Sequence, residues 1–167
     1  MTGVAMRFRP AIPDDAHRVL ELYHTVIGQA FCVWNEQYPG MSEITHDIET
    51  GNLFVLEEDD AIIGAISIVP ENEMDDLPCW MRKDKACEIA RVVINPDHQG
   101  KSLSRLLVQE IIRILEAERE CGSIHLSVAS VNVPAYRTYA KLGFLTVGEV
   151  DMYGNHYVLC EKVLAGT

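Results

Sequence analysis

Hydrophobic and polar residues along the chain follow two spacings, one typical of helices and one typical of strands. The strongest helical spacing covers residues 102–120, where apolar side chains recur every three or four positions up to the stop at Gly122. Weaker helical patterns cover residues 13–28, 42–50 and 134–142, and Ser42 is the expected N-cap of the second of these. We therefore expect about four helices.

Strand-like runs separate and follow these helices, at residues 6–10, 52–57, 61–69, 86–95, 123–129, 144–150 and 156–163. Short turns join two pairs of runs, which predicts antiparallel hairpins, while the strand–helix–strand order in the middle predicts a parallel pair. We expect one domain over residues 1–167, of mixed α/β (α+β) class, with a central sheet of six to seven strands flanked by helices.

The composition is that of a globular protein, with 48% apolar and 23% charged residues. A formal net charge of −11 disfavours nucleic acid as a partner, and it either attracts cationic amines or serves solubility. No stretch is apolar for long enough to cross a membrane, so we expect a cytoplasmic protein. The five cysteines are widely spaced, which predicts reduced thiols and no metal site.

A candidate binding loop follows the strand at 86–95. The chain passes through Pro96 and a polar turn directly into the long helix that begins near Ser102. The start of such a helix has unpaired backbone N–H groups and a partial positive charge, and both favour a pyrophosphate. An ordinary strand-to-helix connection capped by serine remains the alternative.

This loop resembles the coenzyme A site of the GNAT superfamily of N-acetyltransferases. In that family a strand ending in Val-x-Pro precedes a Gln/Arg-x-x-Gly-x-Gly/Ala loop whose amides hold the pyrophosphate. The chain has Ile94-Asn95-Pro96 and then Gln99, Gly100, Lys101, Ser102, Leu103 and Ser104. The two positions where the family has small residues are Ser102 and Ser104 here, so we expect the coenzyme to bind more weakly or through different hydrogen bonds. We also expect a negative φ at Ser102, which serine adopts freely.

A second segment, from Asn132 to Phe144, matches the family's whole Asn-x-x-Ala-x-x-x-Tyr-x-x-x-Gly-Phe signature. Helical spacing predicts that Asn132, Tyr136 and Tyr139 share one face. The resemblance implies that the Asn bonds the pantetheine arm and that Tyr139 lies beside the thioester sulfur. Without this resemblance, a Tyr in an amphipathic helix is more often a core residue.

The resemblance implies a GNAT-like fold and direct acetyl transfer from acetyl-CoA, the co-substrate, to a primary amine in a ternary complex. Such an amine is mostly protonated at neutral pH, so the reaction needs a base. Strand alternation puts Glu88 on one face with Ala90, Val92 and Ile94, and we predict Glu88 as that base, directly or through water. A solvated strand-end carboxylate is the alternative.

Further roles follow from the same resemblance and from reaction chemistry. Tyr139 would protonate the leaving thiolate, and backbone groups near Val93 and Ile94 would orient the acetyl carbonyl. Trp34 and Tyr38 either line an aromatic acceptor pocket or pack between helices. The loop at 71–80 also lies on the expected acceptor side, whereas His125 is expected to be structural.

Two other functions remain open at this point. One is a coenzyme A-binding sensor or non-catalytic GNAT-like module, and the other is a structural domain without a ligand. The expected partners are acetyl-CoA and an amine acceptor, with no nucleic acid or membrane, and the chain is either a monomer or a homodimer. The sequence does not identify the acceptor.

Overall fold

A computed structural model describes residues 5–70 and 74–164, so residues 71–73 of the predicted acceptor loop lie outside the description. The order of elements is the predicted one, with short 3₁₀ turns η1 (Pro13–Asp15) and η2 (Pro96–His98) added. The strands are β1 (Met6–Pro10), β2 (Leu53–Glu58), β3 (Ala61–Val69), β4 (Ala86–Ile94), β5 (Ser123–Ala129), β6 (Leu145–Met152) and β7 (Asn155–Val163). The helices are α1 (Ala16–Thr25), α2 (Met41–Glu49), α3 (Leu103–Glu118) and α4 (Val133–Lys141).

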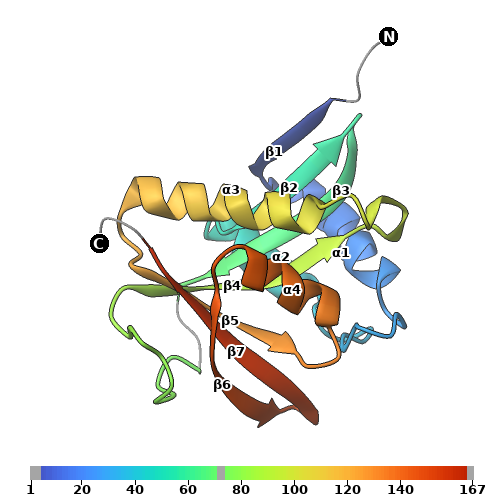
Figure 1. Ribbon diagram of the computed structural model, residues 1–167. Helices are drawn as coiled ribbons and strands as arrows, with labels where there is room; N and C mark the ends of the chain where they lie inside the picture. The colour runs from blue at the N-terminus through green and yellow to red at the C-terminus, as the bar shows by residue number, and fades with distance from the viewer. Residues whose placement is uncertain (1–4, 71–73, 165–167) are drawn as a thin grey trace.

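The seven strands form one mixed sheet in the order β1-β2-β3-β4-β5-β7-β6, which confirms the predicted fold class. Neighbouring strands are antiparallel except for β4 and β5, which pair in parallel. Helices α3 and α4 lie on one face of the sheet, and α1 and α2 lie on the other (Figure 1).

Each face of the sheet has its own apolar cluster. The larger one packs α3 and α4 on the sheet, and Leu107 and Ile111 of α3 are fully buried in it. The smaller one packs α1 and α2 on the opposite face, around Val19, Tyr23 and Ile44. Burial of these helix faces is the main stabilising contribution, at about 25 cal/mol per Å² of apolar surface.

Strands β4 and β5 pair over only part of their lengths. Described pairs run from Ala86↔Ser123 to Glu88↔His125 and then stop, although both strands continue. Beyond that point the two strands separate, and the backbone polar groups along the inner edge of β4 lose their ladder partners. This gap in the middle of the sheet is where a ligand can reach the backbone.

A β-bulge in β4 corrects the predicted facing of its side chains. The register with β3 shifts between Ala65 and Ser67, and Arg91 has a φ of 51°. The extra residue breaks the alternation. Ile94 therefore packs on the α3 side with Ile89, and Val93 packs on the α1 side.

The expectation that Glu88 shares a face with Val92 and Ile94 is therefore wrong. Glu88 shares a face with Ala90 and, beyond the bulge, with Val93, because Val92 also packs with the α3 cluster.

The predicted N-cap of the second helix, Ser42, is wrong as well. Gly40 is the N-cap of α2, and the Glu43 carboxylate accepts a hydrogen bond from its N–H at 2.9 Å. Glu43 is the third residue of the helix, and its hydrogen bond from Gly40 N–H takes the place of the predicted cap by Ser42.

Candidate active site

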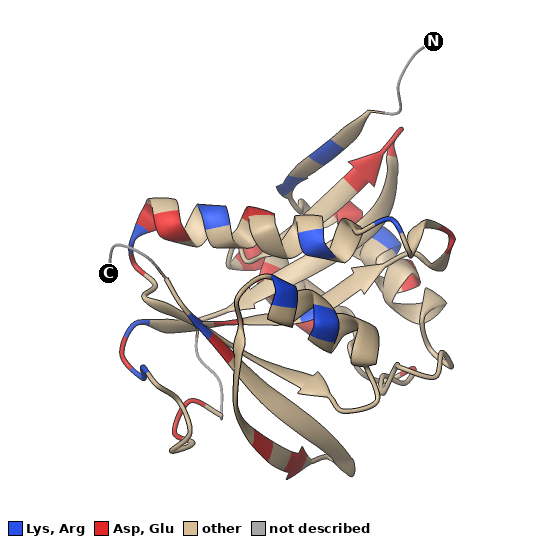
Figure 2. Ribbon diagram, in the orientation of Figure 1, with Lys and Arg blue, Asp and Glu red and all other residues tan. Residues whose placement is uncertain are grey.

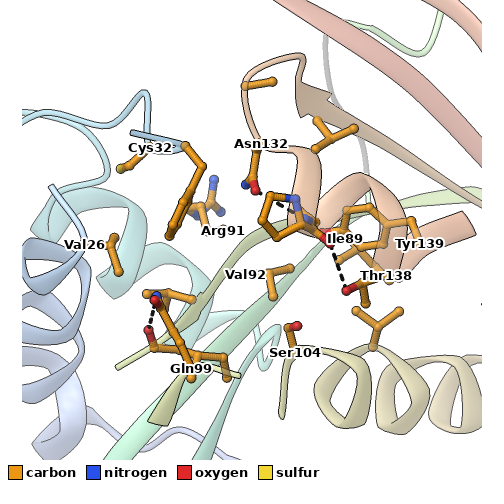
Figure 3. Close-up of a pocket in the computed structure, with 18 of the residues that line it drawn as sticks. Val26, Cys32, Ile89, Arg91, Val92, Gln99, Ser104, Asn132, Thr138 and Tyr139 are labelled. Atoms are coloured by element: carbon orange, nitrogen blue, oxygen red, sulfur yellow. Dashed lines mark hydrogen bonds between the residues drawn. The ribbon is translucent and has the colours of Figure 1, made fainter. Parts of the chain in front are cut away.

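A cavity of about 500 Å³ opens between the separated halves of β4 and β5. It extends from the N-terminal end of α3 past α4 to the segment between α1 and α2. Figure 3 shows Gln99 and Ser104 on one side of it, Asn132, Thr138 and Tyr139 on another, and Arg91 and Cys32 beyond. Segments that are distant in the sequence therefore share one cavity.

The loop before α3 forms one end of the cavity. Gln99, Gly100, Ser102, Leu103 and Ser104 of the predicted coenzyme loop all line it. The first helical bond of α3 runs from Leu106 N to Ser102 O, so the amides of the preceding turn have no acceptor within the helix. These amides and the helix dipole suit an anionic group.

The conformation expected for Ser102 is wrong. Ser102 is the N-cap of α3 with a φ of 61°, in the left-handed region, and its side chain makes no capping hydrogen bond. Our expectation assumed a position already inside the helix, where φ is negative. That assumption holds for Ser104 in the first turn, but at Ser102 the chain is still completing the turn through Gly100, which has a φ of 83°. A side chain in this region costs about 1–2 kcal/mol.

Side chains hold this loop in place before any ligand arrives. The Gln99 amide donates to Ile94 O at 3.3 Å and exchanges hydrogen bonds with Gln29. Asn95 Oδ1 accepts from Asp97 N at 2.9 Å and so caps η2. The loop is therefore anchored both to β4 and to the segment that follows α1.

Helix α4 contributes Asn132 and Tyr139 to the cavity. Asn132 is the N-cap of α4, and its Oδ1 accepts from Ala135 N at 3.2 Å, which leaves the side-chain NH₂ group to act as a donor. Tyr139 is 8% exposed and packs edge-on against Phe144. Burial, together with the nearby Cys160 thiol, raises the pKa of Tyr139 well above its ordinary value. The phenol therefore keeps its proton over the whole physiological range.

Four predicted site residues do not line the cavity: Glu88, Lys101, Tyr136 and Tyr38. The Tyr136 hydroxyl instead bonds Thr146 Oγ1 of β6 at 2.8 Å, so Tyr136 does not share the cavity-facing side of α4. Glu88 is buried one residue before the lining residue Ile89. Their roles remain predictions that the arrangement of the cavity does not by itself support.

Trp34 is placed so that both of the roles that the sequence left open remain predictions. It lines the cavity, and its ring packs edge-on against Tyr23 of α1 with centroids 5.3 Å apart. Tyr38 instead is 46% exposed, and its hydroxyl accepts from Arg91 Nη1 at 3.3 Å. Of these two aromatic residues, only Trp34 therefore lines the far end of the cavity.

Sequence reasoning missed Arg91, which lines the cavity at this far end. Its Nη2 donates to Asp47 Oδ2 at 2.6 Å, and Asp47 also accepts from Ser67 Oγ at 2.8 Å. A regular strand gives no hint of this position, because the bulge alone turns the side chain toward α2. Ser127 of β5 was missed because the gap between β4 and β5 leaves no local pattern, and Thr138 of α4 and Tyr157 of β7 were missed as well.

No helix within residues 5–70 and 74–164 is long and apolar enough to cross a membrane. Across the same residues, no group of three or more His, Cys, Asp or Glu side chains is arranged to hold a metal ion.

Comparison with known proteins adds information beyond the geometry. The family model described as the acetyltransferase (GNAT) family matches residues 18–144. The chain is 24% identical over 160 residues to the L-amino acid N-acyltransferase MnaT of Escherichia coli (strain K12), covering 91% of this chain and 87% of that protein. It is 32% identical over 71 residues to the spermine/spermidine N(1)-acetyltransferase of Bacillus subtilis, covering 42% of this chain and 47% of that protein.

Among solved structures, the chain resembles that of YncA from Salmonella typhimurium with its cofactor acetyl-CoA, with a TM-score of 0.75 and 20% identity. The superposition covers 98% of this chain and 96% of the other. At this identity the likeness shows a shared fold.

Proposed function

The chain belongs to the acetyltransferase (GNAT) family and is an N-acetyltransferase, and we propose that it transfers the acetyl group of acetyl-CoA directly to a primary amine in a ternary complex. The observation that carries this proposal is one continuous cavity that reaches from the amides at the start of α3 to the Tyr139 side chain. A coenzyme whose diphosphate lies on those amides can extend its thioester toward Tyr139 between β4 and β5.

The residues at the α3 end fit the diphosphate of acetyl-CoA. The loop supplies unpaired amides, and a Cβ built at Gly100 would meet no atom within 4 Å, so this approach to the loop is open. Lys101 and Arg105 add positive charge near the start of α3 in a chain of net charge −11 (Figure 2). The fold shared with YncA, solved with acetyl-CoA, supports the same ligand.

The acceptor amine must lose a proton before or during attack. A free amine with a pKa of about 10.4 is only about 0.04% neutral at pH 7, which corresponds to about 4.6 kcal/mol. In our proposal Glu88 removes this proton. Because Glu88 does not line the cavity, the transfer passes through a bridging water.

The leaving group, the thiolate of coenzyme A, requires a proton from a second side chain. The neutral amine nitrogen bonds the acetyl carbon and gives its second proton to water, the carbon–sulfur bond breaks, and Tyr139 gives its phenolic proton to the thiolate. Tyr139 regains a proton from solvent before the next turnover. Its position in the cavity wall supports this role, and its raised pKa means that the phenol carries its proton at neutral pH.

The acceptor that the cavity suits best carries a carboxylate. Among the described residues that line it, Arg91 is the one side chain with a permanent charge, and none is Asp or Glu. Arg91 Nη2 is paired with Asp47, but its Nε has no hydrogen-bond partner within the described residues, and this donor favours a carboxylate over a polycation. We therefore propose an amino acid as acceptor ahead of a polyamine, in keeping with the name of the Escherichia coli relative.

The proposal can be tested by measuring thiol release from acetyl-CoA with a panel of L-amino acids and polyamines. We expect turnover with amino acids, measurable binding of acetyl-CoA by calorimetry, and a Tyr139→Phe variant with lower kcat but measurable activity, because thiolates leave readily.

Three results would count against parts of this proposal. Binding of acetyl-CoA without thiol release from any amine would favour a coenzyme sensor. A calorimetric titration without heat would favour a domain that binds no coenzyme. Faster turnover with spermine than with amino acids would remove the role of Arg91 while leaving the reaction itself in place.

A further inference from the structure

A row of three buried ionisable side chains crosses the sheet behind the cavity. Glu88 of β4 pairs with His125 of β5, and His125 pairs with Glu161 of β7. Residues paired across neighbouring strands project to the same face, so the three side chains lie side by side. Their exposed fractions are 8%, 1% and 0%. Acidic side chains are almost never buried this deeply unless they are paired.

On β4 and β5, this row lies two residues before side chains that line the cavity. Ser127, two residues after His125 on the same face of β5, lines the cavity, and so does Ala90 of β4. The alternate residues of β5, which are Ile124, Leu126 and Val128, pack toward α3 instead. The row is therefore the layer directly behind the place where β4 and β5 separate.

Glu161 and His125 are joined by a dense set of hydrogen bonds. The Glu161 carboxylate accepts from Met81 N at 2.6 Å, from Arg82 N at 3.0 Å and from Ser123 Oγ at 2.6 Å. His125 Nε2 lies 2.8 Å from Arg82 O and 3.3 Å from Glu161 Oε2. Both of these neighbours are acceptors, so Nε2 carries the proton.

The other ring nitrogen of His125 is left without a partner. Nδ1 is buried and makes no hydrogen bond within the part of the chain that the structure describes. An imidazole protonated on Nε2 presents a bare lone pair at Nδ1, which is a base. A buried acceptor without a donor costs about 1–3 kcal/mol, so its retention calls for an explanation.

We infer that His125 is a positioning residue that takes the acceptor amine's proton over from Glu88, an inference that rests on the proposed role of Glu88 as general base. The amine proton moves to the Glu88 carboxylate and then to His125 Nδ1, directly or through one water. The resulting imidazolium is stabilised by the Glu161 carboxylate and by Arg82 O, which both face its Nε2–H. When the acetylated product has left, the imidazolium returns this proton through Glu88 and the same water to solvent, so both side chains are ready for the next amine.

The groups around His125 allow this charge to form. Glu88 faces it from β4 and Glu161 faces it from β7, while the loop before β4 contributes Arg82 through its carbonyl and the Trp80 ring. The Trp80 ring stacks on the imidazole with centroids 3.9 Å apart and holds its orientation. A cation on an aromatic face between two carboxylates is favourable.

The test compares kcat and its pH profile in the full-length wild type, Glu88→Gln, His125→Gln and Trp80→Phe proteins. Glutamine at 125 keeps an amide N–H near the Nε2 position but has no base in place of Nδ1. We expect His125→Gln to lower kcat about tenfold, to leave KM for acetyl-CoA unchanged, and to change the shape of the kcat–pH profile. Trp80→Phe loses the hydrogen bond to Met74 O and the larger ring that orients the imidazole, so it should be less stable and should lower kcat less than His125→Gln does.

The outcomes distinguish the role of Glu88 as general base from the relay to His125. A wild-type profile in Glu88→Gln overturns the role of Glu88 and the relay with it. A changed profile in Glu88→Gln together with a wild-type profile in His125→Gln overturns the relay alone. If His125→Gln does not fold, nitrogen NMR of the wild type decides instead, because a proton on Nδ1 at neutral pH contradicts the inference and a proton on Nε2 alone supports it.

Discussion

Ser102 shows how a single side chain can strain a binding loop. It has a left-handed φ of 61° at a position where the family pattern that this loop resembles has glycine, and it makes no capping bond in return. The strain sits next to the amides that we assign to the diphosphate. Coenzyme affinity and local stability are therefore linked at this one position.

We predict that Ser102→Gly stabilises the protein slightly. Relief of about 1–2 kcal/mol of backbone strain is partly offset by about 0.4–1 kcal/mol of added chain entropy in the unfolded state, which leaves a gain of roughly 0.5–1 kcal/mol. Urea denaturation measures this gain, and calorimetry should show tighter coenzyme binding.

Ser104→Gly is the matched control for this prediction. Ser104 lies inside α3, where glycine costs about 0.5–1 kcal/mol. The two variants should therefore change stability in opposite directions. Equal destabilisation by both would mean that Ser102 is not strained in the folded protein.

At the scale of single elements, the N-terminus of α4 has two tasks. Asn132 caps the helix through its Oδ1, and in our proposal its NH₂ group bonds the pantetheine arm. The first task stabilises the fold, and the second contributes to binding. Variants that keep one task and remove the other can separate them.

We predict that Asn132→Ser keeps the stability of the protein but weakens acetyl-CoA binding, because serine caps as well as asparagine but has no amide to offer. Asn132→Ala should weaken binding as well and lower the free energy of unfolding by about 1 kcal/mol. Calorimetry and urea denaturation give the two readouts. Wild-type affinity in Asn132→Ser would remove the pantetheine contact from the proposal.

At the scale of the whole molecule, Asp15 joins the N-terminal elements to the sheet. It is fully buried, and it accepts from Arg9 of β1 at 2.7 Å, from Arg18 of α1 at 2.9 Å and from Ile12 N at 2.8 Å. Arg9 also bonds Glu57 of β2. These bonds, the one to Arg9 first, lower the pKa of Asp15 to about 2.

This pKa predicts an acid-labile contribution to stability. Because the folded-state pKa lies below the unfolded value of 3.8, the contribution is complete above about pH 4 and is lost as the pH falls toward 2. Its size is about 2 kcal/mol. Asp15→Asn should therefore be less stable by about this amount at pH 7, and the difference, measured by urea denaturation, should shrink between pH 4 and 2.

Asp14→Asn is the control, since Asp14 is the exposed neighbour on the same turn. It should leave the free energy of unfolding within about 0.5 kcal/mol of the wild type at both pH values. A pH-independent loss in Asp15→Asn would show that shape, and not charge, explains the contribution of Asp15.

The sequence by itself determined the elements, their order and the family. Helical and strand spacing depend on local burial patterns, and the two GNAT-like segments are contiguous, so both can be read along the chain. Gln99, Gly100, Asn132 and Tyr139 were found in this way, and all four line the cavity.

Only the tertiary structure decided which other residues meet in the site. The bulge that turns Arg91 inward and the early end of the β4–β5 pairing depend on register between strands, and the local sequence does not encode it. The row from Glu88 through His125 to Glu161 exists because three distant segments align in the sheet. Contacts across strands follow from the packing of the whole chain, and no local pattern could have predicted them.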